Sequence, residues 1–222
     1  MSQTEVQLIK SNSVVDGDIV GMSSSKLSGA LPAVSAANLT NIPAANLTGT
    51  LPAISGANLT GISAGITMLD KWFINANYSF SSANTHYVID SGWTRSSTVA
   101  AQKSGTIGSA MTQSSGLFTF PSTGIYYIEY VALTGTSTDQ LNMWSYITEG
   151  TSTSGDDDIS VKASSGDSGT MNTVTHSVVF DVTDVSTRKI FFRGYANTNG
   201  CYLSGNTGGT RTSVTFIRLG DT

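Results

Sequence analysis

A short motif at residues 166–169 is the first place where this sequence offers chemistry. Gly166-Asp167-Ser168-Gly169 matches the loop that carries the nucleophilic serine in one class of serine proteases. Such a serine needs a histidine base that is oriented by a carboxylate. The chain has two histidines, His86 and His176, and neither has a fitting sequence context. We therefore interpret the motif as a turn, and we expect no catalytic residue and no enzymatic activity.

The densest acidic cluster consists of Asp156, Asp157 and Asp158. Carboxylate oxygens are hard ligands that bind calcium, so these three aspartates are candidate metal ligands. Their spacing lacks the alternation of dedicated calcium loops, and a solvated acidic loop is the alternative interpretation. Two histidines and one cysteine do not build a zinc site without carboxylates. We expect no other cofactor.

Several single residues have both a functional and a structural interpretation. The three tryptophans could stack on sugar rings or lie in a core, and exposure decides between the two; they are Trp72, Trp93 and Trp144. The lone cysteine, Cys201, is expected to be a small buried residue. Four asparagines stand in glycosylation sequons: Asn38, Asn46, Asn58 and Asn77. We expect them to make turn hydrogen bonds to their own backbone.

Composition restricts the class of partner. The formal net charge is −4 and the 11 basic residues are scattered, which argues against a nucleic-acid partner. The first residues lack the basic and apolar pattern of a signal peptide, and no apolar run is long enough for a membrane-spanning helix. One cysteine permits no intrachain disulfide. These features predict synthesis in a reducing cytoplasm and no membrane insertion.

The N-terminal third contains a repeat that has no means of folding alone. Leu27–Ser35 recurs twenty residues later as Leu47–Ser55, and Ala-Asn-Leu-Thr occurs three times. Prolines at these intervals exclude a continuous helix and a central strand. The apolar residues are too sparse to enclose a core within one chain, whereas three chains about a common axis would bury them. We predict a trimeric shaft at residues 24–68; a leucine-rich solenoid is the alternative, but it needs more repeats.

The remainder, residues 69–222, holds all Trp, Tyr and Phe of the chain, enough for a true core. Apolar runs alternate with Gly, Ser, Thr, Asn and Asp loops, and several runs have the period of two that strands show. The predicted strands are 85–89, 117–120, 125–133, 141–147, 175–182, 189–195 and 212–219. This spacing predicts an all-β sandwich or jelly roll.

One run of the sequence resembles the second and third strands of the complement-q globular head, a tumour-necrosis-factor-like jelly roll. It is Gly116-Leu117-Phe118-Thr119-Phe120-Pro121-Ser122-Thr123-Gly124-Ile125-Tyr126-Tyr127-Ile128. The end of the chain is similar too, from Val178–Val182 to Ser213–Leu219. The resemblance implies a trimer whose strand faces pack about a threefold axis, with a head that binds ligands. It also implies that Gly124 permits a sharp strand entry and that Tyr126 fills the core.

The N-terminal half is similar to tail-fibre-like proteins of bacteriophages. Together these features predict a virion fibre protein, made in the host cytoplasm, with an anchor at residues 1–23 that docks on other virion proteins. The head would bind a glycan or protein of the host surface, through residues that the sequence does not identify. A purely structural head, collar or baseplate fibre is the alternative. A depolymerase of capsule polysaccharide is disfavoured, because the few carboxylates lie mostly in loops.

Overall fold

The structure is a computed structural model that describes residues 65–96, 105–137, 140–154 and 157–222. The predicted anchor and nearly all of the predicted shaft therefore lie outside the described residues. None of the described residues forms a helix that is long and apolar enough to cross a membrane. The strands are β1 (Met68–Ile74), β2 (Tyr78–Ser79), β3 (Thr85–Val88), β4 (Trp93–Arg95), β5 (Thr112–Ser114), β6 (Leu117–Thr119), β7 (Gly124–Thr136), β8 (Leu141–Glu149), β9 (Asp157–Gly166), β10 (Met171–Val182), β11 (Ile190–Ala196), β12 (Cys201–Leu203) and β13 (Ser213–Gly220).

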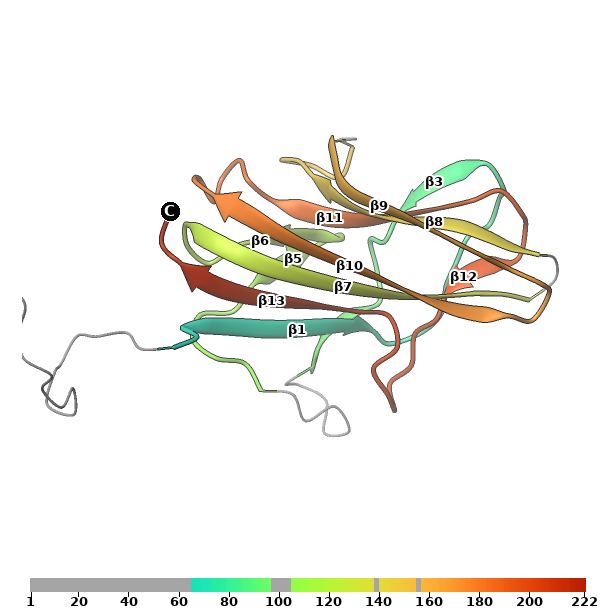
Figure 1. The fold of residues 1–222 in the computed structure, drawn as a ribbon, viewed down its shortest axis with the longest axis horizontal. Helices are drawn as coiled ribbons and strands as arrows, with labels where there is room; N and C mark the ends of the chain where they lie inside the picture. The colour runs from blue at the N-terminus through green and yellow to red at the C-terminus, as the bar shows by residue number, and fades with distance from the viewer. Residues whose placement is uncertain (1–64, 97–104, 138–139, 155–156) are drawn as a thin grey trace, which may run out of the picture. The chain divides into compact units, whose positions relative to one another are not determined.

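Two antiparallel sheets pack face to face (Figure 1). Sheet A has the order β2-β12-β7-β13-β1-β4, and β10 pairs with the other side of β7. Sheet B has the order β5-β6-β11-β8-β9, and β3 pairs with β11 beyond the end of β6. The chain passes repeatedly between the sheets, from β6 to β7, from β7 to β8, from β9 to β10 and from β10 to β11. This is the jelly-roll sandwich that the alternating sequence pattern predicts.

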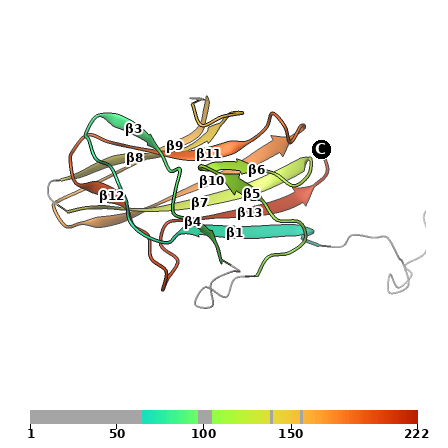
Figure 2. The same cartoon turned by 180° about the vertical axis from the view of Figure 1, so that it is seen from behind.

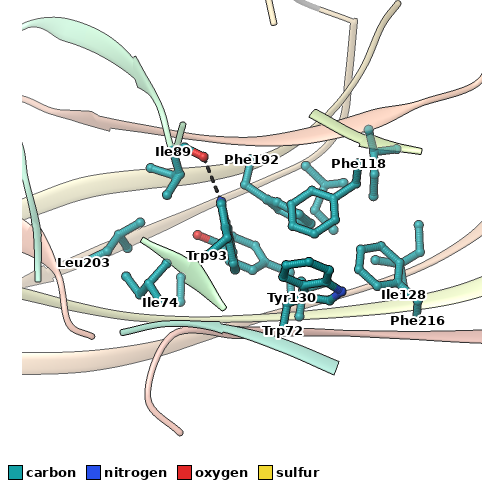
Figure 3. Close-up of a cluster of buried hydrophobic side chains, with 14 of the residues drawn as sticks. Trp72, Ile74, Ile89, Trp93, Phe118, Ile128, Tyr130, Phe192, Leu203 and Phe216 are labelled. Atoms are coloured by element: carbon teal, nitrogen blue, oxygen red, sulfur yellow. Dashed lines mark hydrogen bonds between the residues drawn. The ribbon is translucent and has the colours of Figure 1, made fainter. Parts of the chain in front are cut away.

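The core lies between the sheets and is rich in aromatic rings (Figure 3). Phe118 of β6 is its centre, with its ring 5.5 Å from Trp72, 5.3 Å from Trp93, 5.5 Å from Phe192 and 5.4 Å from Phe216, measured between centroids. These rings come from both sheets, so burying them joins the two layers. Such contacts add to the stabilisation from area burial because edge-to-face rings attract.

The turn before β7 has the geometry that the family resemblance implies. Gly124 has a φ of +144°, and a Cβ atom there would lie 2.6 Å from the carbonyl oxygen of Gly220. Only glycine enters the strand at this angle and this distance. Tyr126 is fully buried, and its hydroxyl donates to the carbonyl oxygen of Ser122 at 2.9 Å.

The seven predicted strands correspond to β3, β6, β7, β8, β10, β11 and β13. Five of the other six described strands escaped prediction for two reasons. β2, β4, β5 and β12 are two or three residues long, too short for a period to emerge. β9 is an edge strand in which most side chains are exposed and polar. β1 begins at Met68, one residue before the predicted start of the head.

Candidate functional site

The outward face of sheet A carries a continuous row of apolar side chains, which we call the apolar row. Backbone pairing places Ile107 beside Leu69, Leu69 beside Ile217, Ile217 beside Tyr127, and Tyr127 beside Val179. Directly paired residues point to the same face of a sheet, so these five side chains form one line across the strands. At about 4.8 Å between neighbouring strands, the line is about 19 Å long.

The members of the apolar row are on the surface of a single head. Val179 is 67% exposed and Ile107 is 45% exposed, while the three between them are half-buried. Leu219, 59% exposed, follows Ile217 on β13. Alternate residues of the same strands face the core, and Tyr126, Ile128 and Phe216 are fully buried there. The outward apolar residues are therefore additional to those that the core requires.

A polar row runs parallel to the apolar row. It consists of Lys71, Thr215, Glu129 and Ser177, which are paired in that order across β1, β13, β7 and β10. The Tyr127 hydroxyl donates to the Ser177 hydroxyl at 3.2 Å and links the two rows. An apolar line with a polar border is the composition of a protein-protein contact surface.

The outward face of sheet B differs in character and carries three adjacent rings. Pairing places His86 of β3 beside Tyr195 of β11, and Tyr195 beside Trp144 of β8. The ring centroids of His86 and Tyr195 lie 4.7 Å apart, and those of Tyr195 and Trp144 lie 5.6 Å apart. His86 is exposed, and the other two are half-buried. We call these three side chains the aromatic platform.

Exposure separates the three tryptophans, as the sequence could not. Trp72 is 9% and Trp93 is 8% exposed, and both lie in the core. Their indole N–H groups donate to the Asp70 carboxylate at 2.9 Å and to the Ile89 carbonyl oxygen at 2.7 Å, the latter drawn in Figure 3. Trp144 faces outward on sheet B and is half-buried. Only Trp144 of the three is therefore placed to contact a ligand.

Tyr146 lies between His86 of the aromatic platform and the ion pair of Arg193 with Asp158. The His86 ring lies 5.4 Å from the Tyr146 ring, and the Arg193 guanidinium lies 5.3 Å from the same ring. Arg193 Nη2 is bound to Asp158 Oδ1 at 2.5 Å, and Thr148 Oγ1 donates to the same oxygen at 2.7 Å. Because the arginine and the aspartate neutralise each other, this part of the face carries no net charge from the pair.

The candidate calcium ligands are therefore in different environments. Asp157 and Asp158 are both exposed residues, but only Asp158 is ion-paired with Arg193, and Asp156 lies outside the described residues. Asp157 and Glu149 border a cavity of about 320 Å³ at the β8–β9 end of sheet B, together with the hydroxyl groups of Ser152 and Ser154. Within the described ranges, the side chains form no cluster of three or more metal-ligating groups. Calcium binding remains a prediction.

The two histidines have separate surroundings. His176 is fully buried between the sheets, and its Nε2 and Nδ1 are hydrogen-bonded to Ser145 Oγ and Ser160 Oγ, each at 2.8 Å. Burial, with a smaller contribution from the Lys162 charge, lowers the His176 pKa to about 4. The imidazole is therefore neutral at physiological pH and joins β8, β9 and β10. His86 belongs to the aromatic platform.

The remaining predicted features are structural. Residues 167–169 of the protease-like motif form the β9–β10 turn, in which the Thr170 amide donates to the Asp167 carbonyl oxygen at 3.0 Å. Cys201 is fully buried, with Sγ 3.2 Å from Thr198 Oγ1. Asn77 differs from the prediction, because its Oδ1 accepts from the distant Gly205 amide at 3.1 Å. The other three sequon asparagines lie outside the described residues.

Neither the apolar row nor the aromatic platform was identified from the sequence. Period-two alternation indicates which residues of one strand share a face, and it marks Val179 as lying opposite Phe180. It does not indicate which strands are neighbours or in what register, so residues as distant as 69 and 217 could not be placed side by side.

No family model and no curated protein matches this sequence. Among solved structures, Eiger TNF from S. frugiperda is 14% identical with a TM-score of 0.49, and covers 71% of this chain and 96% of that chain. Murine APRIL is 14% identical with a TM-score of 0.46, covering 68% and 98% respectively. The vertex protein P5 of PRD1 is 15% identical with a TM-score of 0.45, covering 70% and 99%. Likenesses this distant carry no argument about function.

Proposed function

We propose that this chain is a non-enzymatic structural protein of a bacteriophage particle. Three copies form one fibre, the N-terminal residues join it to other virion proteins, and the jelly-roll heads attach the particle to the host surface. The observation that carries the proposal is the apolar row on the outward face of sheet A, because an exposed apolar row with a polar border marks a contact surface and every copy of the chain has it.

Covering the apolar row with other copies of the chain explains its composition. Full burial of an aliphatic side chain contributes about 1.5–3 kcal/mol, and the row offers Ile107, Leu69, Ile217 and Val179 together with a tyrosine. In a closed ring each copy contacts its two neighbours through the same pair of patches, so an apolar row that faces the threefold axis is covered in every copy. The repeats at residues 24–68 support the same assembly, since their apolar residues gain an interior only among several chains.

Attachment is the role that such an assembly favours. Three heads on one fibre bind a repetitive surface with an avidity far above that of one head. The purely structural fibre shares the fold and the assembly, and differs only in having no ligand on the host.

Two measurements test the proposal. The full-length protein should have a solution mass near 69 kDa, three times the 23.1 kDa of one chain. Antibodies raised against it should label phage particles and slow their adsorption to host cells. Labelling without slower adsorption would favour the purely structural fibre, and unlabelled particles would refute the virion role.

A further variant tests the anchor. Deleting residues 1–20 should leave soluble trimers that are no longer incorporated into particles. Normal incorporation of the truncated protein would show that the attachment to the particle lies elsewhere in the chain.

A further inference from the structure

The aromatic platform on sheet B is the part of the outward surface where aromatic rings of three neighbouring strands meet. Its side chains are on the outward face, apart from the core cluster that Phe118 organises. Among the described residues, the Trp144 indole N–H has no hydrogen-bond partner, in contrast to the indole N–H groups of Trp72 and Trp93. The exposed parts of these three rings present apolar area to water, and a ligand that stacks on them would remove that area from water.

The platform is open on one side. The neighbour of Trp144 on the edge strand β9 is Ala163, an exposed residue with only a methyl group. No larger side chain on β9 directly opposes the indole ring, so a ligand can lie against it from the sheet edge. The cavity at Glu149 is bordered by other residues, and the platform is a surface rather than a pocket. Its occupant should therefore be a group that lies flat on a ring.

Hydrogen-bonding groups stand at the rim of the same rings. The Tyr195 hydroxyl donates to Asn84 Oδ1 at 3.2 Å, so both side chains place polar groups beside the rings. The His86 imidazole is exposed, and the Trp144 N–H can donate to a ligand. A pyranose ring matches this arrangement, because its C–H face stacks on aromatic rings while its hydroxyls bond to groups around the edge. Aromatic side chains with a polar tip suit such half-apolar ligands.

The charges around the aromatic platform distinguish neutral sugars from acidic sugars and from nucleic-acid bases. The chain has a net charge of −4, Arg193 beside the platform is paired with Asp158, and Lys162 of β9 is paired in register with Ser145, whose side chain points to the other face of sheet B. Acidic sugars and the bases of single-stranded nucleic acid both need positive charge nearby. The charge distribution therefore favours an uncharged sugar over either of them.

We propose that the aromatic platform, consisting of His86, Tyr195 and Trp144, binds a neutral saccharide unit of a host-surface polysaccharide. This inference rests on the proposed attachment function and specifies its ligand. The sheet A and sheet B faces are on opposite sides of the sandwich (Figure 2). When three copies turn their apolar rows toward a common axis, their sheet B faces point away from it, and the three platforms can act together on a repeating polymer.

Binding of the full-length protein to immobilised polysaccharides tests the inference. The probes are a neutral glucan, a neutral galactan, a polyuronate and the surface polysaccharide extracted from the host. The wild-type protein should bind the host polysaccharide or a neutral polymer, and should not prefer the polyuronate. Trp144→Ala should weaken binding about tenfold or more, as expected for loss of a central aromatic contact. Trp144→Phe should retain part of it. Val161→Ala, on the same face but outside the platform, is the matched control and should bind normally.

Tryptophan fluorescence supplies a second readout. Since Trp72 and Trp93 are buried, ligand should protect mainly Trp144 from a soluble quencher, and the protection should vanish in Trp144→Phe. Failure of the wild-type protein to bind any probe, preference for the polyuronate, or normal binding by Trp144→Ala would each overturn the inference. Particle labelling and adsorption blocking by antibody would still stand in those cases, so the proposed function is tested separately.

Discussion

Replacing Val179 by aspartate places a short charged side chain at the end of the apolar row. Val179 lies on the edge strand β10 and is 67% exposed in a single head, so the substitution should not disturb the fold of that head. An aspartate is too short to reach water from within an interface, unlike a lysine. The variant therefore separates assembly from folding.

The expected effect on assembly is large. Covering the exposed two thirds of the Val179 side chain contributes about 1–2 kcal/mol per copy. Burying a carboxylate instead costs several kcal/mol after relaxation. The two effects amount to about 4 kcal/mol per copy and about 12 kcal/mol for three copies. Since about 1.4 kcal/mol changes an equilibrium constant tenfold, the association constant should fall by about 10⁸-fold or more.

Light scattering on the eluate of a size-exclusion column measures the outcome. The wild-type protein should have a mass near 69 kDa, three times 23.1 kDa, and Val179→Asp a mass near 23 kDa. The matched control is Val161→Asp, because Val161 is 48% exposed on the opposite sheet and is also on an edge strand. It should remain near 69 kDa. A circular-dichroism spectrum should be unchanged in both variants.

Three results would refute the reasoning. A wild-type mass near 23 kDa would show that the protein does not form a trimer. Persistence of the full mass in Val179→Asp would show that the apolar row is not the interface. Dissociation of both variants would show that aspartate in an edge strand disrupts assembly wherever it stands, and the assignment to sheet A would lose its support.

Three further predictions concern the stability of the head and are measured by urea unfolding. Gly124→Ala should lower the free energy of unfolding by about 1–3 kcal/mol, because an alanine is strained at a φ of +144° and its Cβ would meet a backbone oxygen; a change below about 0.5 kcal/mol would contradict this. Asp70→Asn should cost about 3–5 kcal/mol by removing the buried carboxylate that binds Arg95 at 3.2 Å, whereas Asp167→Asn in an exposed turn should be neutral. Folding lowers the His176 pKa from 6.5 to about 4, so the neutral imidazole contributes about 3 kcal/mol to the free energy of unfolding. This contribution is complete above pH 6.5 and is lost as the pH falls to about 4. His176→Gln should abolish that part of the pH dependence, and an unchanged slope would exclude this histidine as its source.

Strand prediction succeeded where one face of a strand is buried and the other is not. β10 alternates His176, Val178, Phe180 and Val182 against exposed residues, and the period of two is evident in its sequence. It failed for β9, whose side chains are mostly exposed because the strand ends sheet B. The family resemblance correctly indicated the conformation at Gly124 and the burial of Tyr126, since both depend on residues close together in the chain.

The candidate ligands and the tryptophans show where local reasoning stops. Asp158 belongs to an acidic run in the sequence, yet its partner is Arg193, thirty-five residues away. Their sequence neighbours did not separate Trp72, Trp93 and Trp144, and Trp144 faces outward because β8 presents alternate residues to opposite sides of sheet B. The pairing of β8 with β9 and β11 then determines its neighbours.

The sequence by itself determined the all-β class, the seven clearest strands and the low charge that disfavours nucleic acid, because these depend on composition and on spacing along one chain. Only the tertiary structure decided which outward side chains become neighbours. Residues 107, 69, 217, 127 and 179 form one row, and residues 86, 195 and 144 form another, through strand order and register. Backbone hydrogen bonds join strands irrespective of side chain, so the residues of one strand do not specify its partner. The partner is selected by the packing that buries the inner faces of both sheets at once.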